Sequence, residues 1–388
     1  CALPIWIFFP IGQGAFYAER HNNFNIVYDC GNWKQTKLSR KIVSQSFNKN
    51  ESIKILFISH LDWDHISLLE TLKNTVSSID YVILPLLHDE QKILLSNLHR
   101  TLGYYSYSII NSPQDFFGDK VKIVYVESSE NDGDNDRVID LDDNDNLDRK
   151  IASGTKITIN NNSYNWCFIP FNVENTARNE LLEIELGKAG FDVEKLKKEP
   201  KYTKSNILTK DEKNKLKKVY ESLEGGINEN SLVIYSGPNI ECEICHGLRH
   251  SKHFKHFKNF RYIYNYREYI GLDFLGTIDK IGCIYTGDSN LNSFDITKIY
   301  KKHWDMVGTV QIPHHGSIKN FNSSFLAAKY LICPISFGTN NSYGHPSYKV
   351  VNDIICCDSY VINVTEEIDS GYIQVFSYNC TCDFQDNA

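Results

Sequence analysis

The sequence has no long apolar run, since its hydrophobic stretches are only about five to nine residues long, whereas a membrane-spanning helix needs roughly 18 or more. No segment is therefore expected to cross a bilayer. The apolar opening from Ala2 to Pro10 lacks the basic start and the small-residue cleavage site of a secretory signal. This opening instead predicts a first strand.

The sequence also lacks an even, closely spaced set of cysteines. Its eleven cysteines are dispersed, and four of them (Cys30, Cys167, Cys283 and Cys333) lie inside apolar runs. This pattern argues against a disulfide framework and predicts buried thiols in a reducing compartment. The expected location is the cytoplasm.

Internal repeats are absent, and no Gly-x-Ser-x-Gly segment offers a nucleophilic serine. What is present is a chain of 388 residues with 41% hydrophobic content, which can bury one large core or two modest ones. Strand-like segments such as Phe24 to Tyr28 and Ile53 to Ser59 alternate with helix-like segments such as His65 to Val76. Such units in both halves predict an α+β fold with two packed sheets and helices outside them.

The net charge of −7 is unevenly distributed. The segment from Glu127 to Asp148 holds ten acidic residues and one arginine, a local charge of −9, so the rest of the chain carries +2. We expect this acidic segment to be a solvated loop. The net charge alone therefore does not exclude a nucleic-acid partner.

The segment His60-Leu61-Asp62-Trp63-Asp64-His65 carries four potential metal ligands directly after an apolar strand. His60 and Asp62 lie two residues apart, so an extended backbone directs them to the same side. Asp64 and His65 follow in a turn and can reach a second ion. Three more turns at strand ends bear ligands: Asp288, His314-His315 and His345.

Any one of these residues could be an ordinary polar loop residue. Four such turns in one chain, however, predict a binuclear hydrolytic centre. The predicted metal ligands are His60, Asp62, Asp64, His65, Asp288, His314 and His315, and the predicted catalytic residues are Asp64, Asp288 and His345.

The first of these motifs resembles the metal motif of the metallo-β-lactamase superfamily, which is normally His-x-His-x-Asp-His. The version with Asp at the second position resembles the hydrolase domain of ComEC-type DNA-uptake proteins of bacteria. Further motifs occur in the matching order, and the resemblance runs from about Ile11 to Ser347. These motifs are Asn230-Ser231-Leu232-Val233, Thr286-Gly287-Asp288, His314-His315-Gly316-Ser317 and Tyr343-Gly344-His345-Pro346.

The resemblance implies an αββα four-layer sandwich and two divalent ions, Zn or Mn. It assigns His60 and Asp62 to one ion and Asp64 and His65 to the other, with Asp288 as the bridge. His314 would be the final ligand and His315 its neighbour, and Asp29 would orient the metal loop. His345 would lie near the leaving group as a ligand or a proton donor. The usual third histidine of the first ion is missing, and an oxygen-rich site favours Mn²⁺ over Zn²⁺.

The chain is expected to form a single domain over residues 1–388 with insertions at about 127–225 and about 238–277. The second insertion allows two functional interpretations. A structural zinc could be bound by Cys242, Cys245, His246 and His250, although the spacing matches no standard finger. Alternatively, cations interleaved with aromatic residues could bind a polyanion, in which case the substrate-binding residues are Arg249, Lys252, Lys255, Lys258 and Arg261. Aromatic side chains that merely cover the core remain a third interpretation.

These patterns predict a metal-dependent hydrolase, most specifically a phosphodiesterase or nuclease acting on DNA or another nucleotide polymer. Two cations would lower the pKa of a water and stabilise the charge that develops on a phosphodiester. The alternative is a small-molecule phosphoesterase or another metallo-hydrolase using the same site. A larger protein assembly, such as a bacterial defence complex with this chain as its effector domain, is a further hypothesis.

Overall fold

The computed structural model describes residues 2–104, 107–129, 135–143, 148–159, 165–174, 176–205, 208–222, 230–239, 247–253, 273–277, 280–327 and 329–378. Within these residues the strands form two mixed sheets. The first has ten strands in the order β13 (Asp273–Thr277), β12 (Gly247–His253), β18 (Tyr372–Tyr378), β1 (Ala2–Phe8), β2 (Tyr17–Arg20), β3 (Asn25–Tyr28), β4 (Ser52–Phe57), β5 (Ser78–Pro85), β6 (Lys122–Glu127) and β8 (Lys150–Ala152). The second has eight strands in the order β17 (Tyr360–Val364), β16 (Ile332–Ser336), β15 (Val307–Val310), β14 (Gly282–Tyr285), β11 (Asn230–Pro238), β10 (Trp166–Glu174), β9 (Lys156–Thr158) and β7 (Val138–Asp140).

The alternation of side chains along the strands explains why the sheets stack. In β1, Trp6 and Phe8 face the other sheet, whereas Ile5 and Ile7 belong to a separate cluster on the outer face. Strands of the second sheet alternate in the same way between the inter-sheet cluster and an outer cluster. Each sheet is buried on its inner face by the other sheet, so a layer of helices must cover its outer face.

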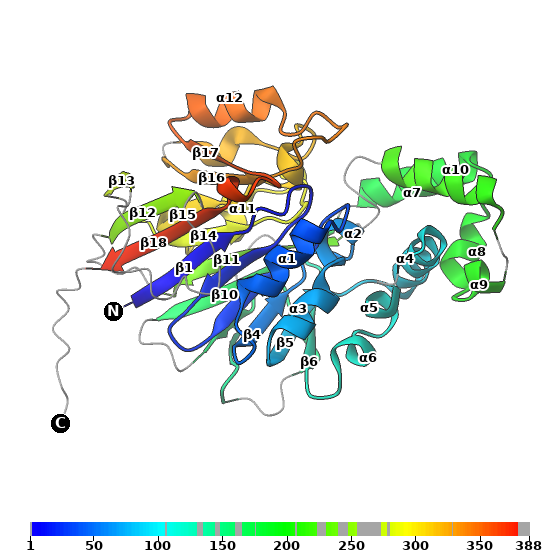
Figure 1. The fold of residues 1–388 in the computed structure, drawn as a ribbon, viewed down its shortest axis with the longest axis horizontal. Coiled ribbons are helices and arrows are strands. Elements are labelled where there is room, and N and C mark those ends of the chain that lie inside the picture. The colour runs from blue at the N-terminus through cyan, green and yellow to red at the C-terminus, as the bar shows by residue number, and fades with distance from the viewer. Residues whose placement is uncertain are drawn as a thin grey trace.

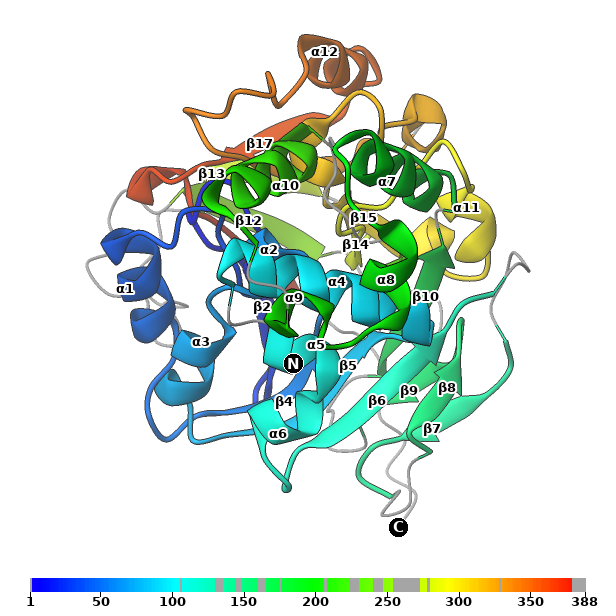
Figure 2. The same ribbon diagram turned by 90° about the vertical axis from the view of Figure 1, so that its right-hand side faces the viewer.

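Helices provide these outer layers (Figure 1). The outer cluster of the first sheet includes side chains from α1 (Lys37–Ser46), α3 (Leu69–Thr75), α4 (Asp89–Leu102), α5 (Tyr107–Asn111) and α6 (Pro113–Phe117). It also includes side chains from α7 (Thr176–Lys188), α8 (Val193–Lys198) and α10 (Lys210–Ser222), and the short α9 (Tyr202–Ser205) lies with them against α4 (Figure 2). The outer cluster of the second sheet includes side chains from α11 (Ile296–Ile299) and α12 (Tyr348–Cys356).

This architecture confirms the predicted four-layer arrangement of helices, sheet, sheet and helices. Cys30, Cys167, Cys283 and Cys333 are fully buried, as predicted, and burial raises the pKa of the Cys30 and Cys333 thiols. None of the helices in the described residues is long and apolar enough to span a membrane.

Two local predictions were wrong. The helix expected from His65 to Val76 is two helices, α2 (Trp63–Ile66) and α3, because the backbone leaves the helical conformation at Leu68. The acidic segment is not a loop throughout, since β7 lies within it and pairs with β9. Ile139 and Leu141 explain this strand, because both are buried between the sheets.

Glu19 is a fully buried carboxylate that joins the two sheets. In the first sheet it accepts a hydrogen bond from the Tyr28 hydroxyl (3.2 Å), and His21 Nε2 lies 3.2 Å from it. From the second sheet, the hydroxyls of Tyr285 (3.0 Å) and Ser236 (2.8 Å) donate to it. A carboxylate has enough lone pairs for all of these donors.

The Glu19→Gln variant is expected to lower the free energy of unfolding by about 1–3 kcal/mol, because the amide removes an acceptor from buried donors. Urea denaturation would measure this change. The matched control is Glu70→Gln, an exposed residue on α3, which should leave the unfolding free energy almost unchanged. Equal stability of the two variants would contradict the inter-sheet role of Glu19.

Candidate metal centre

The candidate ligands lie where strands of both sheets end. Strand β4 runs parallel to β3 and β5 and ends at Phe57, just before the loop that contains His60. In the second sheet β14, β15 and β16 are parallel, so their carboxyl ends meet at one edge. Asp288 follows β14, and the His314-His315 pair follows β15. Backbone contacts join the two edges, since the Leu232 N–H donates to the Ser59 carbonyl (2.8 Å).

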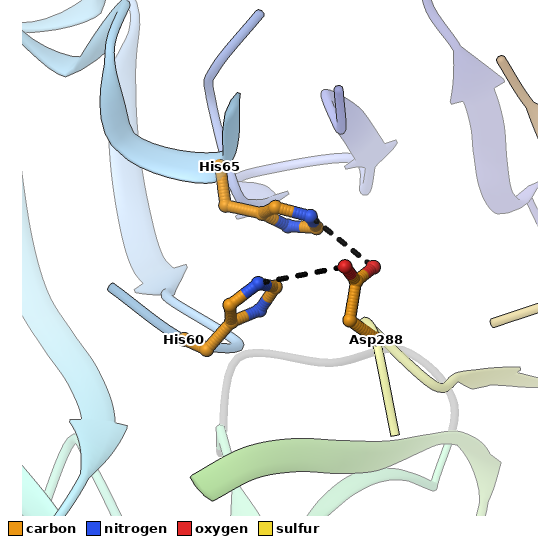
Figure 3. A group of neighbouring side chains, drawn as sticks. All are labelled: His60, His65 and Asp288. Atoms are coloured by element: carbon orange, nitrogen blue, oxygen red, sulfur yellow. Dashed lines mark ion pairs between the residues drawn. The ribbon is translucent and has the colours of Figure 1, made fainter. Parts of the chain in front are cut away.

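Among the residues that the structure describes, His60, His65 and Asp288 form one group that could hold an ion. The two imidazoles face the carboxylate of Asp288 (Figure 3). His65 Nε2 is 3.3 Å from Asp288 Oδ1, and His60 Nε2 is 3.7 Å from Asp288 Oδ2. All three residues are buried.

A second group shares His65 and adds Asp64 and His315. His315 Nε2 is 3.1 Å from Asp64 Oδ2, and the His65 and His315 ring centroids are 6.2 Å apart. The two groups are therefore adjacent, and the shared imidazole lies between them.

Hydrogen bonds fix the tautomers of two of these histidines. His315 Nδ1 lies 2.7 Å from the Ser336 carbonyl oxygen, which can only accept, so Nδ1 carries the proton. His65 Nδ1 lies 2.8 Å from Asp29 Oδ2 and donates to that carboxylate. In both rings the Nε2 lone pair then faces the centre, which is the arrangement found in metal-binding histidines.

His60 and His314 also direct their Nε2 lone pairs to the centre. The Ser59 hydroxyl donates to Asp29 (2.6 Å), so it acts as an acceptor towards His60 Nδ1 (2.9 Å). Asn320 uses its amide nitrogen to donate to the Asp288 carbonyl (3.1 Å), and its oxygen therefore faces His314 Nδ1 (2.8 Å). All four imidazoles thus present Nε2 to the site.

The donor set fits a divalent cation. A lone pair on His315 Nε2 and a carboxylate oxygen at 3.1 Å repel each other unless a proton or a metal ion lies between them. Two ligands about 2.0–2.1 Å from a tetrahedral zinc ion are about 3.3–3.4 Å apart, close to the separations at His315–Asp64 and His65–Asp288. The residues present therefore match the size and charge of such an ion.

Neighbouring groups of opposite charge shift the pKa values of two candidate ligands. Burial acts to raise the pKa of Asp288, but His314, His65 and His60 hold it well below its usual value. Burial acts to lower the pKa of His65, but Asp288, Asp29 and Asp64 raise it well above its usual value. A metal ion would replace the protons that balance these carboxylates in the metal-free chain.

The backbone at the centre is strained and closely packed. Asp29, His314 and His315 have positive φ angles of 53°, 48° and 55°, which non-glycine residues rarely adopt. Gly31 lies directly against the metal loop, and a Cβ at this position would be only 2.4 Å from the Asp64 carbonyl oxygen. Only glycine allows this approach.

Three other predicted site residues, Asp62, His314 and His345, lie near these two groups but belong to neither of them. Asp62 Oδ2 is 3.7 Å from His60 Nε2, and His314 Nε2 is 3.9 Å from Asp288 Oδ2. His345 is buried beside His314, with ring centroids 5.4 Å apart, and the Asn341 side chain binds both its backbone N–H and its carbonyl. Asn341 therefore fixes the position of His345.

The predicted substrate-binding and zinc residues are only partly described. Arg249, His250 and Lys252 lie on β12, which pairs with β18 near the edge of the first sheet. The other residues of these two predictions lie outside the described residues: Cys242, Cys245, His246, Lys255, Lys258 and Arg261.

Sequence reasoning missed Ser59 and Asn320, which orient His60 and His314. Ser59 could have been suspected, because it directly precedes the first ligand. Asn320 offered no such signal, since its role depends on the turn that follows β15.

Comparisons with known proteins bear on this site and on the fold. Residues 11–90, which include His60, Asp62, Asp64 and His65, match the model of the metallo-beta-lactamase superfamily. A search of the curated proteins found no match.

Similar solved structures include the metallo-beta-lactamase fold protein YhfI from Bacillus subtilis, with 8% identity, 95% of this chain and 98% of that chain covered, and a TM-score of 0.36. They also include the short form of human tRNase Z, with 8% identity, 93% and 92% covered, and a TM-score of 0.35. The two mixed sheets and their outer helices are consistent with the metallo-β-lactamase sandwich, and residues 11–90 carry the sequence pattern of that superfamily.

Proposed function

We propose that this chain is a metal-dependent phosphodiesterase that acts on a nucleotide polymer. The observation that carries the proposal is the pair of adjacent ligand groups that share His65. Their imidazoles all present Nε2, and their carboxylates are buried against those nitrogens. Buried carboxylates and imidazoles converging from several strand ends are typical of hydrolytic metal centres.

The ligands divide between two ions according to the carboxylate oxygens that they face. His65 faces Asp288 Oδ1 and would hold one ion together with Asp64 and His315. His60 and His314 face the other oxygen, Oδ2, and Asp62 lies beside His60. Asp288 would then contribute one carboxylate oxygen to each set of ligands. His314 would supply the imidazole that the sequence motif lacked at the first ion.

Bound divalent ions supply Lewis acidity, which makes a water nucleophilic at neutral pH and stabilises charge on a phosphodiester. The chain's own residues hold the proposed ligands in position. Asp29, through Ser59 and His65, fixes the metal loop, and Asn320 fixes His314. His345, held by Asn341, protonates the leaving oxygen.

The phosphodiester class is supported by the sequence. The motif order resembles ComEC-type hydrolase domains, and cations interleave with aromatic residues between Arg249 and Arg267.

Hydrolysis of single-stranded DNA, double-stranded DNA and bis(p-nitrophenyl) phosphate should be measured with Mn²⁺ and with Zn²⁺. Turnover of the diesters is the expected result. No turnover of any of them by a metal-loaded chain would overturn the proposal.

The His345→Ala variant separates a proton donor from a ligand. We expect it to bind metal normally but to hydrolyse a diester with an alkyl leaving group about 100- to 10,000-fold more slowly, because general acid catalysis contributes this much. A p-nitrophenolate leaving group needs little protonation, so its release should be much less affected. Loss of bound metal in this variant, measured by elemental analysis, would instead make His345 a ligand.

A further inference from the structure

A cleft of about 350 Å³ lies beside the metal centre. Its walls are formed by residues 11–13, by residues 32–34 and by the loop of residues 340–343 that follows β16, with Glu366 at one side. This volume is near the lower end of the about 300–1,000 Å³ that small-molecule sites occupy. The cleft therefore suits one small group rather than a duplex.

The walls of the cleft are continuous with the metal centre. Residues 11–13 lead into Ala15, whose N–H donates to the Asp64 carbonyl (3.3 Å). Tyr343 lines the cleft, and its ring stacks against the ring of His345 with centroids 5.8 Å apart. Asn341 lines the cleft and donates to the His345 carbonyl (2.6 Å). A group bound in the cleft would thus lie close to a phosphate held at the metal centre.

Hydrogen bonds between the walls hold the cleft open. Gln13 Oε1 accepts from the Gly338 N–H (3.1 Å), and the Gln13 carbonyl accepts from the Trp33 N–H (2.8 Å). The Asn32 side chain donates to the Ile11 carbonyl. These contacts tie three separate loops together without any ligand, so binding requires little reorganisation.

The chemistry of the walls favours a flat, uncharged, polar group. Trp33 and Tyr343 supply aromatic surface, and Tyr343 is 40% exposed. Of the described residues that line the cleft, Lys34 is the only cation and Glu366 the only anion, so these residues carry no net charge. Burial acts to raise the pKa of Glu366, but hydrogen bonds from Thr339 and the charge of Lys34 lower it. An isolated phosphate would bind weakly in this cleft. A nucleobase would bind more tightly, because it can stack on the aromatic rings and form hydrogen bonds with the amide side chains.

We propose that this cleft binds the nucleoside attached to the scissile phosphate, with its base against Trp33 and Tyr343. This inference rests on the proposed phosphodiesterase function. It narrows the substrate to nucleotides that are unpaired at the cleavage position, because a paired base cannot enter so small a cleft.

The test compares two diesters that share the p-nitrophenolate leaving group: thymidine 5′-(p-nitrophenyl) phosphate and methyl p-nitrophenyl phosphate. The wild-type chain should prefer the thymidine ester in kcat/KM. Trp33→Leu and Tyr343→Leu should each reduce this preference about 5- to 150-fold, the effect of losing one stacking partner. Leucine keeps the apolar packing of Trp33 against the core. Tyr348→Leu, at a side chain 84% exposed on α12, is the control and should keep the preference.

A second measurement does not depend on turnover. Binding of thymidine 5′-monophosphate to the metal-free chain, followed by ligand-observed NMR, should weaken in both cleft variants and not in the control. Equal kcat/KM for the two diesters in the wild-type chain, or an unchanged preference in both variants, would overturn the nucleoside cleft. If neither diester is hydrolysed, the proposed function fails, and the binding measurement alone decides whether the cleft accepts a nucleotide.

Discussion

The Asp288→Ala variant is expected to lose diester hydrolysis by more than about 1,000-fold, because its carboxylate faces three of the candidate histidine ligands. Its Oδ1 faces His65, and its Oδ2 faces His60 and His314. Removing it should also reduce the bound metal from two ions to one or none. Steady-state kinetics and elemental analysis of the same preparation would measure both effects.

The matched control is Asp89→Ala, whose side chain is 94% exposed at the start of α4. It should keep full metal content and turnover. Circular dichroism would confirm that Asp288→Ala remains folded, as expected for a residue at the edge of the core clusters. An Asp288→Ala variant that retains two ions and wild-type turnover would contradict the bridging role.

The candidate ligands could be recognised along the chain because each follows an apolar strand. Strand β4 was recognisable as a short β-branched and aromatic run, and β14 and β15 as strands that end in ligand-bearing turns. That the end of β4 meets the ends of β14 and β15 depends on the packing of the two sheets. The two packed sheets were predicted from the strand-then-helix units in both halves of the chain.

The sequence did not indicate which carboxylate His314 approaches and which carboxylate His315 approaches. This pairing depends on a turn in which both residues adopt positive φ angles before Gly316, a conformation that the sequence did not indicate. It also depends on Nδ1 acceptors supplied from elsewhere, the Ser336 carbonyl for His315 and Asn320 for His314. Consequently His315 approaches Asp64 and His314 approaches Asp288.

The interruption between α2 and α3 has a similar cause. The periodicity of Ile66, Leu69 and Leu72 is helical, so a single helix was a reasonable prediction. The Ser67 N–H still donates to the Trp63 carbonyl (2.9 Å), as in a helix, but the Leu68 N–H donates to the Cys30 carbonyl (2.9 Å) in the turn after β3. The Ser67 hydroxyl donates to the Asn32 carbonyl (2.9 Å) in the same turn. These long-range contacts hold the metal loop against that turn.

Asp29 is the residue through which that turn contacts the candidate metal centre. Its carboxylate accepts from the Ser59 N–H (2.7 Å), from the Ser59 hydroxyl (2.6 Å) and from His65 Nδ1 (2.8 Å). We regard it as a positioning residue, since its contacts are to ligands and to the loop rather than to the centre itself. Its position at a φ of 53° shows that the fold holds it there despite backbone strain.

The Asp29→Asn variant should weaken metal binding about 10- to 100-fold, the usual effect of removing the partner of a metal-binding histidine. The amide offers one acceptor where the carboxylate offered two, and if its NH₂ faces His65 the ring must place its proton on Nε2 and cannot bind an ion there. The metal affinity of both ligand groups should fall, because His65 belongs to each of them. Competition titrations with a chromogenic chelator would measure the affinity, and Asp89→Asn is the control. A merely structural role predicts a lower unfolding temperature of the metal-free chain with unchanged metal affinity, and that outcome would contradict the positioning role of Asp29.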